Sequence, residues 1–222
     1  MDLDKKVDIS FVILTWNSQA MIESCVKTFA KSIEQSNVEA EFILVDNGSI
    51  DKTVDILSNI VLPNLPKCCR GEVIKLSKNM GTTKSRNIGL RKINSSFCVV
   101  CDSDTEFLRG DWRQAMDLLK NNEQIGILAA HLYYDDNTTQ QSVKKFPTLI
   151  DKILKLRKPF FRMQESTTDY YKDFIWEKSR EVDTAISAFW MFRNDLIDTV
   201  GLLDEKIYYS PEDIDFCLRV WL

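Results

Sequence analysis

The sequence predicts an α/β fold in which a mainly parallel sheet carries helices on both faces. Its 222 residues, 44% hydrophobic and 28% charged, suit a globular chain with a substantial core. Short apolar runs alternate with stretches of helical spacing, a pattern typical of strands buried on both faces between helices. Polar residues follow several of these runs, where the carboxyl edge of a parallel sheet binds ligands.

Two β-α units occupy the first part of the chain. Ile9–Leu14 predicts a strand, and Asn17 or Ser18 is placed to cap the following helix. Glu41–Val45 predicts the second strand, and Asp51 is placed to cap the next helix. The apolar residues of these helices are Ile22, Cys25, Val26, Phe29 and Ile33 in the first, and Val54, Ile56 and Leu57 in the second.

The alternation continues into the middle of the chain. Glu72–Leu76 predicts a strand that leads into a helix through Leu90, and Phe97–Cys101 predicts the fourth strand. Met116–Leu119 belongs to another helix, and Ile125–Leu132 predicts a further strand.

Composition and charge exclude several classes of protein. With 29 Lys and Arg against 33 Asp and Glu, the net charge of −4 argues against a nucleic-acid-coating surface. The apolar runs are far shorter than the roughly 18 residues of a membrane span, and the polar start predicts no secretion. Because no repeat or long linker is visible, we expect one cytoplasmic domain over residues 1–222.

The cysteines and the single histidine are assigned to structure rather than to chemistry. Cys98 and Cys101 form a CxxC inside the fourth predicted strand, where an offset of three directs the two side chains to opposite faces. Redox and zinc sites place this motif on turns, so we expect six reduced thiols. His131 lies in an apolar run and is expected to be structural, which argues against a Ser or Cys triad.

Residues 144–162 form a basic stretch with seven Lys and Arg residues and one acid, Asp151. Apolar residues interleave with the charges, as in an amphipathic helix on an anionic membrane surface or a polyanionic acceptor. A solvated helix that packs its apolar face on the domain explains the same pattern. Both interpretations stay open.

Asp102-Ser103-Asp104 follows the fourth predicted strand and brings two carboxylates to the ligand edge. Mg²⁺ and Mn²⁺ bind through one or two carboxylates while phosphate oxygens fill other positions. A turn with two solvated acids is the alternative. The position beside other polar strand ends favours a metal site formed by Asp102 and Asp104.

Asp46 ends the second predicted strand and opens a turn with Asn47-Gly48-Ser49. Its carboxylate either serves only this turn or accepts the N3–H of a pyrimidine base. Trp16, at the end of the first strand, either stacks on that base or belongs to the core.

Ser210-Pro211-Glu212-Asp213 precedes a helix with apolar residues at helical spacing. Ser210 at the cap, Pro211 at the first position and an acid at the third form a predicted capping box. A helix N-terminus also favours an ionised carboxylate, as a general base requires. Since no GxSxG, P-loop or GxGxxG motif is present, carboxylates and a cation have to carry the chemistry.

Together these segments resemble the family 2 glycosyltransferases of the GT-A fold. TTQQSVKKFPTL is similar to the subgroup that contains bacterial rhamnosyl and related cell-surface polysaccharide transferases. The resemblance implies a Rossmann-like GT-A domain with a nucleotide-binding half over about 1–105 and an acceptor half over about 106–222. The similar segments, in chain order, are FVILTWN, ILVDNGSIDKT, LSKNMGTTKSRNIGL, VVCDSDTEF and EVDTAISAFWMFRNDLIDTVGLLDEKIYYSPEDIDFCLR.

The resemblance also implies an inverting transfer of one sugar from a UDP- or dTDP-sugar to a hydroxyl of a glycan or lipid-linked acceptor, with Mn²⁺ or Mg²⁺. Asp213 would be the base, supported by Glu212 and Ser187, and Asp102 and Asp104 would flank the metal and diphosphate. Arg86 would stabilise charge on the departing diphosphate. The nucleotide-binding residues would be Thr15, Trp16, Asn17, Asp46, Asn79, Arg86 and Asp102.

Two departures from the family pattern bear on this site. Ser187-Ala188 stands where the family usually has Gly-Ala, and a side chain there would narrow the sugar and acceptor pocket. Many members have a His beyond the last motif that completes the metal site, whereas this sequence stops at Leu222. We therefore expect a C-terminal part of the natural protein to be missing.

Two other functions remain open. A sugar nucleotidyltransferase shares the α/β architecture and the metal, but it normally starts with a Gly-rich loop, and LTWNSQAM contains no glycine. A non-catalytic nucleotide-binding domain would bind the same ligands without turnover. Uracil and thymine present the same N3–H, so the sequence does not decide between UDP and dTDP or identify the sugar.

Overall fold

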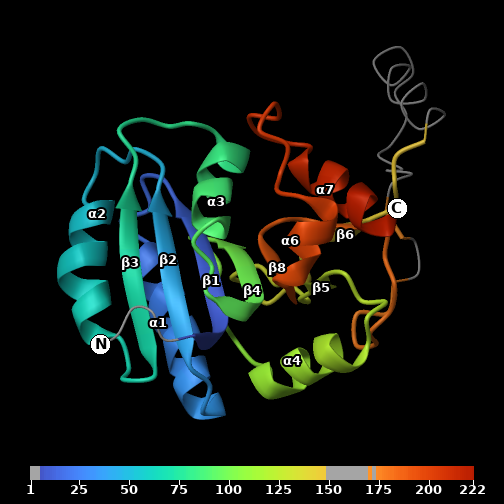
Figure 1. Ribbon diagram of the computed structural model, residues 1–222, viewed down its shortest axis with the longest axis horizontal. Coiled ribbons are helices and arrows are strands. Elements are labelled where there is room, and N and C mark those ends of the chain that lie inside the picture. The colour runs from blue at the N-terminus through green and yellow to red at the C-terminus, as the bar shows by residue number, and fades with distance from the viewer. Residues whose placement is uncertain (1–5, 149–169, 172–173) are drawn as a thin grey trace.

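A computed structural model describes residues 6–148, 170–171 and 174–222. A six-stranded sheet in the order β3-β2-β1-β4-β8-β5 runs through the molecule (Figure 1). A second, two-stranded sheet pairs β6 with β7. The strands are β1 Val7–Thr15, β2 Ala40–Asp46, β3 Cys69–Lys75, β4 Ser95–Asp102, β5 Leu128–Ala129, β6 Val143–Lys144, β7 Thr184–Ala185 and β8 Phe189–Arg193.

Four strands of the large sheet are parallel. β1 pairs with β2 on one side and β4 on the other, and β2 pairs with β3. β8 runs antiparallel to both β4 and β5. The prediction of a mainly parallel sheet is confirmed. The pattern does not predict β8, however, and the strand expected over Ile125–Leu132 is reduced to the two residues of β5.

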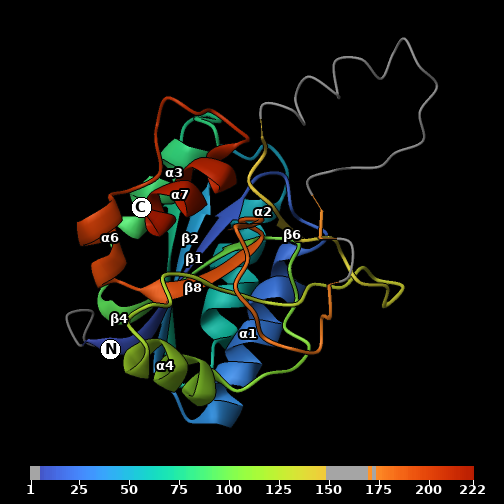
Figure 2. The same ribbon diagram turned by 90° about the vertical axis from the view of Figure 1, so that its right-hand side faces the viewer.

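Helices cover both faces of this sheet (Figure 2). Residues of α1 and α4 belong to the core on one face, and residues of α3 and α7 belong to the core on the other. α2 continues into a π-helical turn at Leu57–Val61 and a 3-10 turn at Leu62–Asn64. The helices are α1 Ile22–Ser36, α2 Thr53–Ile56, α3 Thr82–Leu90, α4 Trp112–Asn121, α6 Asp195–Val200 and α7 Glu212–Trp221.

Each face of the sheet has its own apolar core because successive strand residues point to opposite sides. On the face of α1 and α4, Phe11 stacks on Phe42 with ring centroids 4.8 Å apart, and Trp112 meets Phe11 edge-on at 5.2 Å. On the face of α3 and α7, Trp190 stacks on Phe216 at 5.4 Å. These cores pack both faces of the sheet beneath its carboxyl edge, where the polar loops lie.

The residues assigned to structure occupy the places expected of them. Cys98 and Cys101 are fully buried in opposite cores, and all six cysteines are free. His131 is half-buried between Tyr133 and Trp176, with ring centroids at 4.1 and 4.7 Å. Desolvation by burial lowers the pKa of this histidine, which favours its neutral form. These features agree with structural roles.

Two helices begin differently from the prediction. Neither Asn17 nor Ser18 caps α1, because a turn separates them from the helix, which begins after Met21 without a side-chain cap. The carboxylate of Asp51 accepts the Thr53 N–H at 3.0 Å, so it serves the start of α2 although Lys52 lies between them.

The basic stretch predicted over 144–162 lies largely outside the described residues. Lys144 ends the strand β6, so no helix begins there, and residues 149–162 belong to the part that is not described. Among the described residues, no helix has the length and apolar character needed to cross a membrane.

Candidate functional site

Three parallel strands end side by side at the carboxyl edge of the sheet. Thr15 of β1 lies opposite Asp46 of β2, and Leu14 lies opposite Asp102 of β4. Asn79, in the loop after β3, is hydrogen-bonded to the loop after β2. The predicted gathering of polar strand ends at one edge is therefore present in the structure.

Asp46 is fully buried at the end of β2. Its Oδ2 accepts the Ser49 backbone N–H at 3.1 Å, as the predicted turn requires. Within the described part of the chain, its Oδ1 and the Thr15 hydroxyl are buried without a hydrogen-bond partner. Buried polar atoms are seldom left unpaired, so these two atoms point to a bound ligand. An imide N–H is a hydrogen-bond donor that the free Oδ1 of Asp46 could accept.

Trp16 and Asn17 begin the loop after β1. The Trp16 side chain is 54% exposed, so the alternative that places it in the core is wrong, and its ring is accessible for stacking. Asn17 accepts the Ile50 N–H at 2.9 Å through its side-chain oxygen and donates its own N–H to Ser49 Oγ at 2.8 Å. Asn17 thus ties the loops after β1 and β2 together beside Asp46.

A cluster around Asn79 joins the loop after β3 to the segment before α7. Asn79 Oδ1 accepts hydrogen bonds from Asn47 Nδ2 at 3.0 Å, the Gly81 N–H at 2.9 Å and the Tyr208 hydroxyl at 2.9 Å. Gly81 has a φ of +85°, and a Cβ there would lie 2.6 Å from the Tyr208 carbonyl oxygen. The sequence places Asn47 in the turn at this edge, whereas it does not single out Tyr208, and the glycine that Tyr208 approaches is a local signal of this contact.

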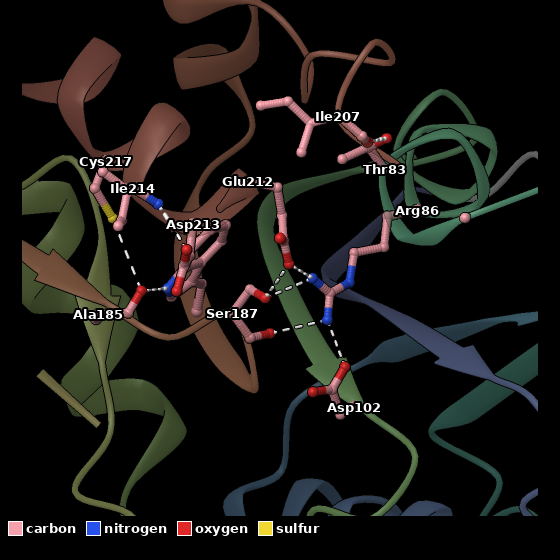
Figure 3. A network of polar contacts seen from close by, with 12 residues as sticks. Thr83, Arg86, Asp102, Ala185, Ser187, Ile207, Glu212, Asp213, Ile214 and Cys217 are labelled. Atoms are coloured by element: carbon pink, nitrogen blue, oxygen red, sulfur yellow. Dashed lines mark hydrogen bonds and ion pairs between the residues drawn. The ribbon is translucent and has the colours of Figure 1, made fainter. Parts of the chain in front are cut away.

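Arg86 of α3 lies at the centre of a buried polar cluster, shown in Figure 3. Its Nη2 donates to Asp102 Oδ1 and to the Ser187 carbonyl oxygen, the latter at 3.2 Å. Its Nη1 donates to the Ser187 hydroxyl at 2.6 Å and lies 3.5 Å from Glu212 Oε1. Both terminal nitrogens of the guanidinium group thus contact protein groups, whereas its buried Nε has no hydrogen-bond partner among the described residues. Its contact with a diphosphate stays a prediction.

Ser187 and Glu212 complete this cluster. The Ser187 hydroxyl donates to Glu212 Oε1 at 3.1 Å, and both side chains are buried. The Ser187 side chain was expected to narrow the sugar and acceptor pocket. In the structure its polar end is turned into the cluster with Arg86.

Asp102 and Asp104 are the predicted ligands of a divalent cation. Asp102 Oδ1 is paired with Arg86, but 41% of the Asp102 side chain remains exposed. The pKa of Asp104 is raised, mainly by partial desolvation and to a smaller extent by the negative charge of Asp102. The Asp104 side chain is still accessible to solvent. A cation would relieve this repulsion, so the two carboxylates fit a hard metal.

The protein groups alone do not form a closed metal site. Among the described residues, no group of three or more His, Cys, Asp or Glu side chains is arranged to hold an ion. Two carboxylates with phosphate oxygens from a ligand are a usual set for Mg²⁺. The structure is therefore compatible with a cation that binds together with a phosphorylated ligand.

Asp213 follows Glu212 in the first turn of α7. It is half-buried, and its Oδ1 accepts the Ile214 N–H at 2.8 Å. Seen in Figure 3, Asp213 and Asp102 lie on opposite sides of Ser187. The capping box predicted for this helix is wrong, because Ser210 is exposed and no side chain caps α7. Asp213 is therefore not tied up in a capping box, whereas Glu212 is engaged by Arg86.

Comparison with known proteins gives one family. Residues 10–201 match the family model described as glycosyl transferase family 2. An uncharacterized glycosyltransferase of Haemophilus influenzae is 30% identical over 103 residues, which are 46% of this chain and 38% of that protein. The succinoglycan biosynthesis protein ExoO of Rhizobium meliloti is 29% identical over 102 residues, 46% of this chain and 27% of that protein. The matches thus span well under half the length of either relative.

Solved structures are similar over nearly the whole chain. TarS 1–349 of S. aureus has a TM-score of 0.65 at 19% identity, and the match covers 96% of this chain and 55% of that chain. Its complex with UDP-GlcNAc has a TM-score of 0.61 at 20% identity, covering 96% and 53%. GalNAc-T7 with UDP, GalNAc and Mn²⁺ has a TM-score of 0.66 at 13% identity, covering 97% and 40%. At these identities the likeness establishes the fold.

Proposed function

The chain belongs to glycosyl transferase family 2 and has the GT-A fold, and on this premise we propose that it transfers a sugar from a UDP- or dTDP-linked donor to an acceptor hydroxyl. One observation carries the donor assignment. Asp46 Oδ1 and the Thr15 hydroxyl are both buried, and neither has a hydrogen-bond partner among the described residues. Structural neighbours that hold UDP, UDP-GlcNAc or Mn²⁺ support the same class of donor.

The proposed donor site follows the edge of the sheet. Asp46 accepts the N3–H of uracil or thymine, and the exposed ring of Trp16 stacks on the base. Asp102 and Asp104 would hold a Mn²⁺ or Mg²⁺ ion together with the donor's diphosphate. When bound, this ion would supply positive charge beside the leaving nucleoside diphosphate.

The proposed transfer is a single displacement with inversion. The acceptor oxygen forms a bond to the anomeric carbon while the bond from that carbon to the diphosphate oxygen breaks. Asp213 takes the proton of the acceptor hydroxyl, a role that the buried and paired Glu212 is less free to fill. No covalent sugar–enzyme intermediate is needed.

The base assignment gives a first prediction. Asp46→Ala should weaken UDP binding at least about 10-fold, because a hydrogen bond to a charged group contributes roughly 1.5–3 kcal/mol. CDP, whose base has an acceptor at N3, should bind the parent chain more weakly than UDP. Calorimetry with both nucleotides checks this. Asp55→Ala, on the exposed side of α2, is the matched control. An unchanged preference for UDP over CDP in Asp46→Ala would remove Asp46 from the base site.

The metal assignment gives a second prediction. UDP should bind more tightly with Mn²⁺ than with a chelator, and Asp104→Ala should abolish this difference. Because the pKa of Asp104 is raised, protons compete with the ion, and the difference should narrow as the pH falls. Calorimetry at several pH values measures it. Equal UDP affinity with and without Mn²⁺ in the parent chain would contradict the metal site.

We further propose the class of acceptor and the place in the cell where the protein acts. A glycan or lipid-linked acceptor in cell-surface polysaccharide synthesis is consistent with the relative named for succinoglycan biosynthesis. The basic sequence of residues 144–162 supports a peripheral contact with the cytoplasmic face of a membrane.

A nucleotide-binding domain without turnover is the competing function. Turnover of the donor in the presence of Mn²⁺ decides between the two functions.

A further inference from the structure

The Ser187 side chain connects Arg86 of α3 to Glu212 of α7. Its hydroxyl accepts a hydrogen bond from Arg86 Nη1 at 2.6 Å and donates one to Glu212 Oε1 at 3.1 Å, while its carbonyl oxygen accepts from Arg86 Nη2 at 3.2 Å. The residue is only 8% exposed. All three of these contacts join residues at least 25 positions apart in the sequence.

The backbone next to Ser187 is fastened to the end of β4. The carbonyl oxygen of Ala188 accepts the Asp102 N–H at 3.2 Å and the Thr105 hydroxyl at 3.3 Å. On its other side, Ser187 reaches Glu212, the first residue of α7, and Asp213 comes next. Ser187 therefore links the carboxylates proposed for the donor side to the helix end that carries the proposed base.

The charges in the cluster explain why a hydroxyl is needed there. The single cation of Arg86 faces two carboxylates, and it bonds directly to Asp102 but lies 3.5 Å from Glu212. The Glu212 side chain is 7% exposed, so little solvent reaches it and a hydrogen bond from the protein matters there. A hydroxyl is both donor and acceptor, so Ser187 serves Arg86 Nη1 and Glu212 Oε1 at once.

We propose that Ser187 is a positioning residue that sets the place of Asp213 relative to Asp102 and Asp104 through Arg86 and Glu212. This inference rests on the proposed glycosyl transfer. Ser187 itself bonds to no reacting atom. Without its hydroxyl, Glu212 loses a buried partner and the first turn of α7 can shift. A misplacement of about 1 Å can cost up to roughly 100-fold in rate.

The test compares Ser187→Ala with Ser187→Thr, which keeps the hydroxyl, and Ser187→Cys, which keeps the size but has only a weakly bonding thiol. Ser142→Ala is the matched control, because Ser142 is also buried, its backbone bonds to Ile186, and its hydroxyl lacks a partner among the described residues. For each variant, calorimetry gives the Kd of UDP with Mn²⁺. Release of nucleoside diphosphate from UDP-glucose, UDP-GlcNAc or dTDP-rhamnose, whichever the parent turns over fastest, gives kcat and KM.

The inference predicts that kcat falls about 10- to 100-fold in Ser187→Ala and Ser187→Cys, while KM and the Kd of UDP stay unchanged. Ser187→Thr should recover most of kcat, and Ser142→Ala should resemble the parent. If Ser187→Ala does not fold, the folded Ser187→Cys decides the question. Parental kcat in these variants, or a parallel loss of UDP affinity, would overturn the inference. A parent chain that neither binds UDP nor turns over a donor would overturn the proposed function first.

Discussion

Asp213→Asn should lower sugar transfer at least about 100-fold while leaving UDP affinity nearly unchanged. Asn is almost the same shape and can still accept the Ile214 N–H that Asp213 accepts at 2.8 Å, so the first turn of α7 should persist. The amide cannot take a proton at neutral pH, and general-base catalysis typically contributes roughly 10²–10⁴-fold. Initial rates of nucleoside diphosphate release, measured beside calorimetric UDP affinity, check both parts.

Asp215→Asn is the control for this experiment, because Asp215 is an acid of the same helix that pairs with Arg219 at 2.9 Å. Its loss should cost a little stability and spare transfer, since such i,i+4 pairs contribute only about 0.3–0.5 kcal/mol. Near-parental transfer in Asp213→Asn would place the base elsewhere, with Glu212 the next candidate. Unfolding of Asp213→Asn would show that the carboxylate serves the helix instead.

Arg86→Leu should lower the free energy of unfolding by about 3–5 kcal/mol, because it leaves the buried Glu212 carboxylate without its cation. Asp102 contributes less to this loss, since its side chain is partly exposed and can be hydrated. Urea denaturation monitored by tryptophan fluorescence measures the change.

The double variant Arg86→Leu/Glu212→Gln tests the cause of that loss. The neutral amide that replaces the Glu212 carboxylate removes the unpaired charge and can still accept the Ser187 hydroxyl, so part of the stability should return. Equal stability of the single and double variants would mean that packing of the Arg86 side chain, rather than the charge on Glu212, accounts for the effect.

The sequence could predict the parallel half of the fold because those strands are long, apolar and buried on both faces. Ile9–Leu14 and Phe97–Cys101 fall inside β1 and β4 for this reason. Strand β8 has the same apolar character, but nothing local distinguishes its antiparallel pairing with β4. The predicted cap at Ser210 failed because the chain before α7 turns toward α3, where the Tyr208 carbonyl oxygen accepts the Thr82 N–H.

The edge of the candidate site could also be predicted. The carboxyl ends of parallel strands lie at one edge of the sheet, so polar residues that follow these strands in the sequence gather there. Asp46 and Asp102 lie at this edge as expected. The contacts of Arg86 could not be predicted, because its bond to Ser187 joins residues 101 positions apart, and only the tertiary fold brings them together. The same holds for the Tyr208 hydroxyl on Asn79.

A crystal structure of the protein with UDP and Mn²⁺ tests the central claim most directly. The account predicts that the uracil N3–H bonds to the Asp46 oxygen that lacks a partner among the described residues, with the base against Trp16. It also predicts that the diphosphate and the ion lie at Asp102 and Asp104. A uracil bound away from Asp46, or a diphosphate and ion bound away from the carboxyl edge of β4, would contradict it.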